Sequence, residues 1–323
     1  MSAPCALSVC VVTYERPAFL VRCLASLAAA LGDGHEVIVV DASAHHDGAA
    51  AEAAFPGATY LHRPGLAGWM TRSRNEALLH ARGDVIAFLD DDVVVAPGWA
   101  TALLAAYATT PRPDAVAGRT RNLLPGEERY DAPIGRLRDD GTLTAGFAAL
   151  SDGIVEVDHG IGANMSFRRE MLARLGGFRD DYPGTAMRED TDMFLRVKRA
   201  GGRTVFVPDA VVDHLPAPHV KGRRFDTRYK LYGRRNHMVM LARHDGLRSP
   251  LLRRWIGAEL RAIGDAGGVV RRLQRLGVTL LGIAWGAGAA IRQARFGPLP
   301  PERSGREADR IRAALGGGSA PSR

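Results

Sequence analysis

Three consecutive aspartates, Asp90, Asp91 and Asp92, interrupt an apolar stretch of the sequence, DVIAFLDDDVVVAPGW. Adjacent carboxylates repel one another, and burying them costs free energy unless a cation or a hydrogen-bond donor accompanies them. Hard cations such as Mg²⁺ and Mn²⁺ take oxygen ligands of this kind. On an extended backbone alternate side chains share a face, so Asp90 and Asp92 are expected on one ion and Asp91 elsewhere. A solvated acidic turn without metal is the alternative.

Two further polar clusters follow apolar runs in the same way. TYER, from Thr13 to Arg16, follows residues 7–12, and Asp41 follows residues 36–40. Continuous apolar runs are typical of parallel strands that are buried on both faces. Because ligands sit at the carboxyl ends of such strands, we expect the three clusters to meet at one site. For Asp41 a turn or a helix cap is the alternative.

The order of the segments predicts an α/β fold with a mostly parallel central sheet and flanking helices. We expect strands over residues 7–12, 36–40, 59–61, 85–89, 115–117 and 203–214. Helices are expected from Pro17 to the glycine at 32, and over 70–81, 97–107 and 188–202. Residues 162–178 predict a strand, a helix and a Gly-Gly stop, and residues 119–160 predict loops and a hairpin over the site.

The net charge of +8 is unevenly distributed along the 323 residues. Residues 246–323 contain 14 arginines, no lysine and 5 acids, whereas the first 245 residues carry 29 bases and 30 acids. The neutral main part, without interleaved aromatic and basic residues, argues against a nucleic-acid-binding protein. The content of 46% hydrophobic and 24% charged residues is that of a globular protein with one large domain and a smaller piece, or two domains.

The cysteines and the N-terminus favour a cytoplasmic location. Cys5, Cys10 and Cys23 form no CxxC pair and are odd in number, so we interpret them as core residues in a reducing compartment. No basic region precedes the first apolar stretch, so no signal peptide is expected. No stretch approaches the roughly 20 apolar residues of a membrane-spanning helix.

Six stretches, taken in order, resemble the family 2 glycosyltransferases of the GT-A fold. They are VVTYERPAFLVRCLASL, EVIVVDAS, SRNEAL, GDVIAFLDDDVVVAPGW, GANMSFRREMLARLGGF and REDTDMFLRVKRAGG. The resemblance, over roughly residues 5–245, implies transfer of a sugar from a nucleotide-diphosphate donor to an acceptor hydroxyl, usually with inversion and with Mg²⁺ or Mn²⁺. The acceptor could be a glycan, a lipid-linked sugar or a natural product. A nucleotide-sugar-binding relative without activity is the alternative, and the retained acids argue against it.

The resemblance also implies a nucleotide-sugar site. The residues that would line the nucleobase and ribose pocket are Thr13, Tyr14, Glu15, Arg16 and Asp41. Many relatives carry asparagine in place of Glu15. Arg74 and Asn75 match an Arg-Asn pair near the nucleotide, and Arg72 is the surface alternative.

The three aspartates correspond to the family's DXD motif. Asp92 would ligate the metal that bridges the diphosphate, and Asp90 would approach the metal or the ribose. Asp91 would approach the ribose or the donor sugar. His214 matches a histidine that often completes the metal site, with a structural histidine or a competing Asp213 as alternatives.

Inversion requires one general base to take the proton of the acceptor hydroxyl. The resemblance implies Asp190 as this base and Glu189 as a residue that orients the acceptor, with Asp192 as a third candidate. Capping of a helix N-terminus is the alternative role for one of these acids. Asn164 and Met165 fall where relatives shape the donor-sugar and acceptor end. A retaining scheme needs a nucleophile, and the sequence singles none out.

We expect a catalytic domain over residues 1–245, a basic amphipathic helical extension over 246–315 and a disordered tail over 316–323. The apolar run at 278–291 is too short to span a bilayer comfortably. An arginine-rich helix with Trp285 can lie on an anionic membrane surface, peripheral on the inner face of the cell membrane. The alternatives are packing on the catalytic domain or a dimer face through Gly282 and Gly286.

Overall fold

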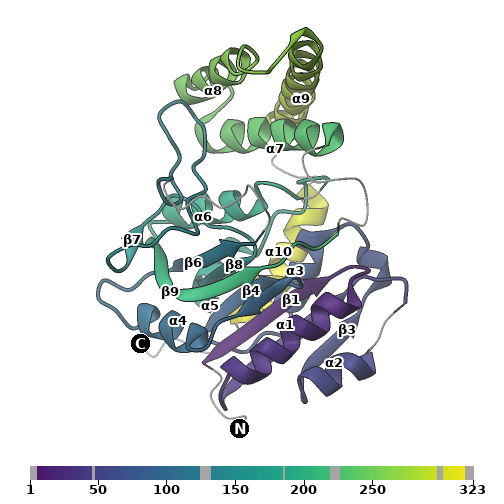
Figure 1. Cartoon of the computed structure of the whole chain (residues 1–323), viewed down its shortest axis with the longest axis vertical. Helices are drawn as coiled ribbons and strands as arrows, with labels where there is room; N and C mark the ends of the chain where they lie inside the picture. Colours follow the sequence, from purple (N-terminus) through teal and green to yellow (C-terminus); the bar gives the residue numbers. More distant parts are fainter. Residues whose placement is uncertain are drawn as a thin grey trace.

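The central sheet of the protein is covered by helices on both faces (Figure 1). The computed structural model describes residues 6–45, 48–123, 132–184, 186–218, 226–296 and 301–316. The described strands are β1 (Leu7–Thr13), β2 (His35–Asp41), β3 (Thr59–His62), β4 (Val85–Asp90), β5 (Val93–Val95), β6 (Ala115–Asn122), β7 (Val155–Glu156), β8 (Asn164–Arg168) and β9 (Thr204–His214). They form one sheet in the order β3-β2-β1-β4-β8-β6-β9-β5, with β7 beside β9.

The predicted parallel arrangement is confirmed for the strands that carry the polar clusters. β3, β2, β1 and β4 run parallel to one another, and β6 runs parallel to β9. β8 is antiparallel to both of its neighbours, and β5 and β7 are antiparallel to β9. β5 was not predicted, because a three-residue strand directly after a turn has no periodicity of its own.

The described helices are α1 (Pro17–Ala30), α2 (Gly48–Ala54), η1 (Pro64–Leu66), α3 (Met70–Leu78), α4 (Trp99–Tyr107), α5 (Arg169–Leu175), α6 (Glu189–Arg199), α7 (Thr227–Asp245), α8 (Pro250–Arg261), α9 (Val269–Phe296) and α10 (Pro301–Gly316). α1 begins at Pro17 as predicted, since a proline at the first helical position loses no hydrogen bond. α4 begins at Trp99 and not at residue 97, because Gly98 adopts a left-handed backbone with φ of 81°. α2, which is mostly alanine, carries no apolar period and was not predicted.

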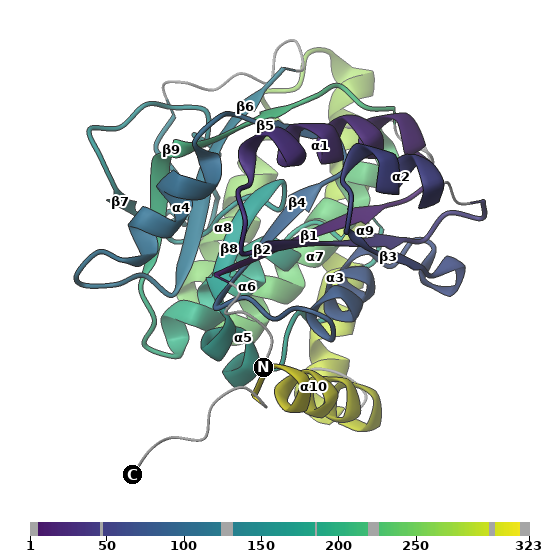
Figure 2. The same ribbon diagram turned by 90° about the horizontal axis from the view of Figure 1, so that it is seen from below.

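Two buried layers hold the sheet between the helices. One layer packs α1 and α4 on the sheet through residues such as Leu24 and Leu103. The other packs α3, α5 and α6 through Leu78, Leu172 and Phe194. Figure 2 shows α1, α2 and α4 on one side of the sheet and α3, α5 and α10 on the other. Cys10 and Cys23 are buried and free, as predicted for core residues, whereas Cys5 lies outside the described residues.

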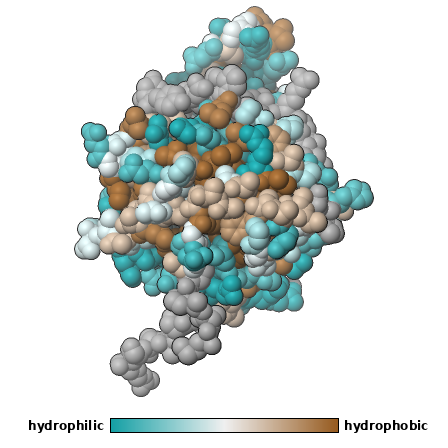
Figure 3. All heavy atoms as spheres, turned by 60° about the horizontal axis from the view of Figure 1, so that its bottom comes forward, coloured by the Kyte–Doolittle hydropathy of each residue, from teal (hydrophilic) through white to brown (hydrophobic). Residues whose placement is uncertain are grey.

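The last four helices divide into two groups. α7, α8 and α9 stand together at one end of the molecule (Figure 1). In Figure 3 this end projects at the top, with apolar and polar side chains side by side. α10 instead returns to the sheet, where Ile311 and Leu315 join the core below α3 and α5. Arg169 of α5 donates hydrogen bonds to the carbonyl oxygens of Ala314 and Leu315 at the end of α10. Part of the expected extension therefore belongs to the main core.

None of the helices in the described part of the chain is both long and apolar enough to cross a membrane. Residues 317–323, most of the expected tail, lie outside the described residues.

Gly282 and Gly286 face α7 of the same chain, so their proposed use as a dimer face is wrong. A Cβ atom on Gly286 would lie 2.6 Å from Cβ of Met238 and 2.8 Å from the carbonyl oxygen of Arg235. A Cβ on Gly282 would lie 2.7 Å from Cβ of Arg234. Both glycines are therefore needed for the close approach of α9 to α7.

We expect Gly286→Ala to destabilise the packing of α9 on α7 by about 1–3 kcal/mol, because the added methyl group meets the α7 backbone. Gly288→Ala on the same helix is the matched control, since no atom lies within 4 Å of its Cβ position. That control should be neutral or stabilise the helix by up to about 1 kcal/mol. Urea unfolding and limited proteolysis of the two variants measure the difference. Equal stability of both variants would contradict this packing.

Candidate active site

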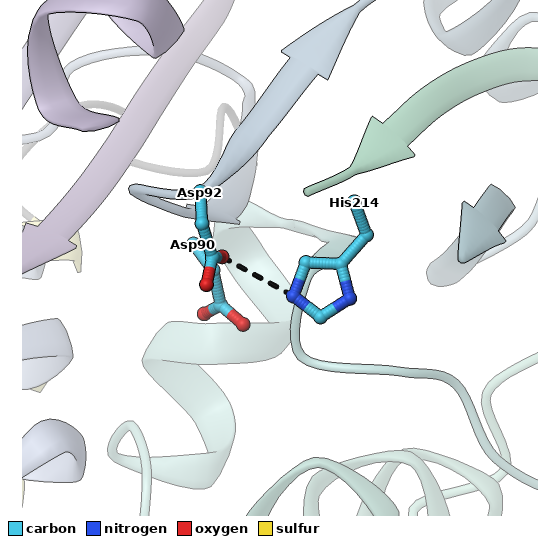
Figure 4. A group of neighbouring side chains, drawn as sticks. All are labelled: Asp90, Asp92 and His214. Carbon is cyan, nitrogen blue, oxygen red and sulfur yellow. Dashed lines mark ion pairs between the residues drawn. The ribbon is translucent and has the colours of Figure 1, made fainter. Parts of the chain in front are cut away.

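Asp90, Asp92 and His214 meet at the carboxyl end of the sheet (Figure 4). Their ligand atoms all lie within 4.8 Å of one another, and Nε2 of His214 is 3.2 Å from Oδ1 of Asp92. The strand β5 explains this meeting, because its antiparallel pairing with β9 places Val93 opposite His214. The aspartates directly before β5 are thereby brought beside the last residue of β9.

The donor set of this cluster fits a divalent cation such as Mg²⁺ or Mn²⁺. Two carboxylates and one imidazole, all at least partly shielded from water, supply oxygen and nitrogen ligands. Burial raises the pKa of Asp92, but His214 and Arg16 outweigh burial and lower it below its usual value. Asp92 is therefore ionised at neutral pH, as a metal ligand must be.

Asp91 turns away from this cluster, as alternation along the chain predicted. Its side chain is buried between β1 and α1, where Thr13 Oγ1 donates to Oδ2 at 2.6 Å and Arg16 forms an ion pair. Burial raises the pKa of Asp91 to about 7, although Arg16 and Thr13 lower it. Arg16 also reaches Asp92, with Nη1 at 2.8 Å from Oδ2. The predicted contact of Asp91 was with the ribose or the donor sugar. In the structure the side chain is closed off from solvent and contacts Thr13 and Arg16.

A pocket of about 130 Å³ lies beside the cluster, between the ends of β1 and β2. Thr13, Glu15 and Asp41, three of the five residues expected around a nucleoside, line it together with Tyr60 and the apolar side chain of Leu20. The hydroxyl of Tyr60 donates to Asp41. Parallel register explains the convergence, since Thr13 pairs with Asp41 across β1 and β2.

Glu15 adopts a left-handed backbone with φ of 56°. Asparagine tolerates that conformation better than most residues, so an asparagine at this position would be less strained than Glu15. The amide of Glu15 donates to Ser43 Oγ at 2.7 Å, and its carboxylate accepts from the amide of Ala44 at 2.8 Å. Ser43 and Tyr60 were missed by the sequence analysis. Tyr60 lies on β3, whose neighbour β2 ends at Asp41, and this adjacency is the signal that could have identified it.

Arg74 connects the metal cluster with the acid pair at the start of α6. Its guanidinium is almost fully buried, forms an ion pair with Glu189, and lies 3.1 Å from Oδ1 of Asp90. It also donates to the carbonyl oxygen of Gly162 at 3.3 Å. Arg74 therefore forms a bridge between Asp90 and Glu189. Its expected contact with the nucleotide stays a prediction. Its neighbour Asn75 is occupied elsewhere, with two hydrogen bonds to the backbone of Phe178.

Glu189 and Asp190 are the first two residues of α6 and differ in exposure. Glu189 is buried and held by Arg74, whereas Asp190 is half-buried. Oδ2 of Asp190 accepts from the amide of Gly162 at 3.1 Å, and Oδ1 accepts from the amide of Thr191. Burial and Asp190 raise the pKa of Glu189 to about 8, against the effect of Arg74. Asp190 is thus the acid of this pair that a second reactant can reach.

Asp192 lies in the same helical turn but faces the helical end of the molecule. Its Oδ1 accepts from the hydroxyl of Tyr182 at 3.0 Å and contacts Nε2 of His244 at 2.9 Å and Nη1 of Arg179 at 3.3 Å. Burial raises the pKa of Asp192, but Arg179 and His244 lower it to about 2 overall. Asp192 therefore ties α6 to α7 and is not placed as a base.

Asp192→Asn should lower the free energy of unfolding at neutral pH by about 3–5 kcal/mol, because it leaves a buried ionic cluster with one partner missing. The folded-state pKa is below the unfolded value of 3.8, so the contribution is present above pH 3.8 and disappears as the pH falls toward 2. Urea unfolding of wild type and variant across this range measures it. A constant stability difference from pH 7 to pH 2 would contradict the assignment.

The other predicted residues have structural partners. Asn164 uses its whole amide group inside the protein, since Oδ1 accepts from Trp99 Nε1 and Nδ2 donates to backbone carbonyl oxygens. Met165 is buried in the core. Both therefore lie in the protein interior, and their predicted place at the donor-sugar and acceptor end stays a prediction. Asp213 is held by Arg121, with Nε at 2.6 Å from Oδ1, so it does not compete with His214. Tyr14 is half-buried outside the pocket lining.

Comparisons with known proteins agree with this geometry. Residues 8–176 match the model of the family described as glycosyl transferase family 2. The succinoglycan biosynthesis protein ExoM of Rhizobium meliloti (strain 1021) is 32% identical over 216 residues. The aligned part covers 64% of this chain and 66% of ExoM, slightly less than two thirds of that protein.

Solved structures with less than 25% identity share the fold. The mannosyltransferase PcManGT from Pyrobaculum calidifontis, in complex with GDP-Man and Mn²⁺, has a TM-score of 0.54 and 19% identity, over 98% of this chain and 88% of that one. GalNAc-T7 with UDP, GalNAc and Mn²⁺ has a TM-score of 0.59 and 14% identity, over 91% and 58%. S. aureus TarS 1–349 with UDP-GlcNAc has a TM-score of 0.56 and 15% identity, over 96% and 90%.

Proposed function

This chain belongs to glycosyltransferase family 2, and we propose that it transfers a sugar from a nucleoside-diphosphate donor to an acceptor hydroxyl with inversion, with the help of a divalent cation. Membership of this family supports glycosyl transfer as the activity, and the structural neighbours share the fold. The observation that carries the finer proposal is the bridge through Arg74. This one buried guanidinium contacts both Asp90 of the cation cluster and Glu189 of the acid pair.

The nucleoside of the donor fits the pocket at the ends of β1 and β2. The ring of Tyr60 and the side chain of Leu20 offer apolar surface for a base, while Asp41 and Glu15 offer acceptors for hydroxyl and amide hydrogens. Asp90, Asp92 and His214 would hold the cation beside this pocket. A bound cation supplies positive charge that stabilises the leaving nucleoside diphosphate. PcManGT and GalNAc-T7, which bind Mn²⁺ with a guanine and a uracil nucleotide, support the metal.

Asp190 is the proposed general base. The acceptor hydroxyl oxygen attacks the anomeric carbon as the bond from that carbon to the diphosphate breaks, and the hydroxyl proton passes to Asp190. A single displacement of this kind inverts the anomeric centre. Glu189 would orient the acceptor from its fixed place on Arg74, and the amide of Gly162 fixes Oδ2 of Asp190.

The cytoplasmic location stays a prediction.

A thermal-shift panel with UDP-, dTDP- and GDP-sugars, each with Mn²⁺ or with EDTA, tests the proposal. A ligand that binds only the folded protein stabilises it by about 2.7 kcal/mol at a hundredfold excess over Kd. We expect a shift for one nucleotide class that requires Mn²⁺, followed by transfer of that sugar with inverted anomeric configuration. Equal shifts with and without Mn²⁺, or a product of retained configuration, would contradict the proposed mechanism.

A further inference from the structure

α9 exposes its large apolar side chains and buries its small ones. Six of its large apolar residues are between 51% and 71% exposed, namely Val269, Val270, Leu273, Leu280, Leu281 and Ile291. The residues that face the protein core are Thr279, Gly282, Gly286, Ala289 and Ala290. At about 100° per residue the exposed set falls on an arc of roughly 120° on the side away from α7. This is the reverse of an ordinary surface helix, which turns its apolar face inward.

The exposed stripe is long and continuous. From Val269 to Ile291, at about 1.5 Å per residue, it runs for roughly 33 Å. Gly277, Ala284 and Gly288 fill the arc between the large residues, so no charged side chain interrupts its middle. An exposed apolar surface of this extent marks a contact with another body.

The charge around the stripe is positive. Arg271, Arg272, Arg292 and Arg295 of α9 are exposed, and the helix contains no acid. Glu259, the one acid of the neighbouring α8, is already paired with Arg234 of α7 at 2.9 Å, and Asp265 is an exposed acid in the turn before α9. The partner of this face must therefore combine apolar depth with negative charge.

We propose that this face of α9 lies on the surface of an anionic lipid bilayer, with the apolar stripe among the acyl-chain ends and the arginines on lipid phosphates. Arg292 lies at the flank of the stripe and Arg295 at its C-terminal end, and such side chains can extend to headgroups while their stems stay in apolar surroundings. A second copy of the chain is a poorer partner, because face-to-face contact would bring two sets of arginines together. Figure 1 shows α9 together with α7 and α8 at one end of the molecule, away from the sheet.

The contact would also orient the rest of the enzyme. Gln293 of α9 donates to Asp181 Oδ2 at 2.7 Å and accepts from Arg243 of α7 at 2.9 Å. His244 of α7 in turn contacts Asp192 of α6. α9 is therefore joined by buried polar contacts to the segment and helix that carry Glu189 and Asp190. If the proposed function holds, a lipid-borne acceptor would approach the acid pair from this surface.

Flotation of the full-length protein with vesicles tests the surface independently of catalysis. We expect binding to vesicles of phosphatidylcholine with phosphatidylglycerol, weaker binding as NaCl rises, and little binding to phosphatidylcholine alone. The triple variant L273Q/L280Q/L281Q should bind at least about tenfold more weakly. Leu150→Gln is the matched control, since Leu150 is 74% exposed in the loop before β7, and its binding should equal that of the wild type.

A second variant, R292Q/R295Q, separates charge from apolar contact and should lose the preference for phosphatidylglycerol. All substituted side chains are exposed, so unfolding temperatures near that of the wild type are expected and are measured in parallel. Absence of wild-type binding to the anionic vesicles overturns the proposal, as does full binding by the triple variant. A wild-type dimer in light scattering that L273Q/L280Q/L281Q dissolves would assign the face to a second copy instead. A failure here would leave the metal-dependent donor shift untouched.

Discussion

Asp92→Asn should remove metal-dependent donor binding and lower kcat/KM by about a thousandfold or more. The carboxylate loses the negative charge that attracts a cation, and one of its oxygens becomes an amide that cannot ligate well. His214 would lose its ionic contact with Asp92, whereas Arg16 would keep its ion pair with Asp91. Titration calorimetry of the donor with Mn²⁺ and with EDTA measures the effect directly.

The matched control for this variant is Asp209→Asn. Asp209 lies on β9, the strand that carries His214, but it is exposed. The control should bind donor and Mn²⁺ like the wild type. Unchanged donor affinity of Asp92→Asn in Mn²⁺, with a folded protein by circular dichroism, would place the cation elsewhere.

Asp190→Asn should leave donor and metal affinity within about twofold of the wild type and reduce transfer by roughly a hundredfold to ten-thousandfold. The amide keeps the size of the side chain and its one oxygen can still accept from one of the Gly162 and Thr191 amides, but it cannot take the acceptor proton. Single-turnover measurement of sugar transfer, beside calorimetry of donor binding, separates the two effects.

Glu170→Gln provides a comparable change in the first turn of α5, where the carboxylate is 64% exposed and pairs only with Arg112 in the described structure. It should transfer sugar at the wild-type rate. Full transfer by Asp190→Asn would exclude Asp190 as the base and direct attention to Glu189. Loss of donor binding in Asp190→Asn would instead mean that the residue supports the nucleotide site.

Local sequence patterns were sufficient for the strands and for the edge at which they end. The apolar runs before Thr13, Asp41 and Asp90 predicted parallel strands, and the observed register sets Thr13 beside Asp41 and Val12 beside Asp90. This works because each buried strand must be apolar along its whole length, so its polar end residue is visible in the sequence. The meeting of Thr13 and Asp41 at one edge follows from the same rule, whereas their place in a nucleoside pocket was implied by the family resemblance.

The sequence could not rank acids that are close neighbours. Asp190 and Asp192 lie two residues apart on α6, yet one faces Gly162 and the other faces His244. Positions two apart on a helix differ by about 200° in direction, so the elements packed on each side decide their roles. Asp91 and Asn164 likewise bind residues of other elements. Asp91 contacts Thr13 and Arg16, and Asn164 accepts a hydrogen bond from Trp99.

The alternation of strands and helices follows from the local sequence pattern. The polar edge of the sheet and the acids that could act there follow from it as well. The contacts that these side chains make with one another depend on tertiary packing. The short strand β5 brings His214 to Asp92, and Arg74 joins Asp90 to Glu189, which lies 115 positions after Arg74 in the sequence. Tertiary packing also decided that Gly282 and Gly286 serve α7 while the large apolar residues of α9 face outward. Periodicity records whether a residue is buried in its own element, but the contact it makes depends on long-range packing, which no local pattern encodes.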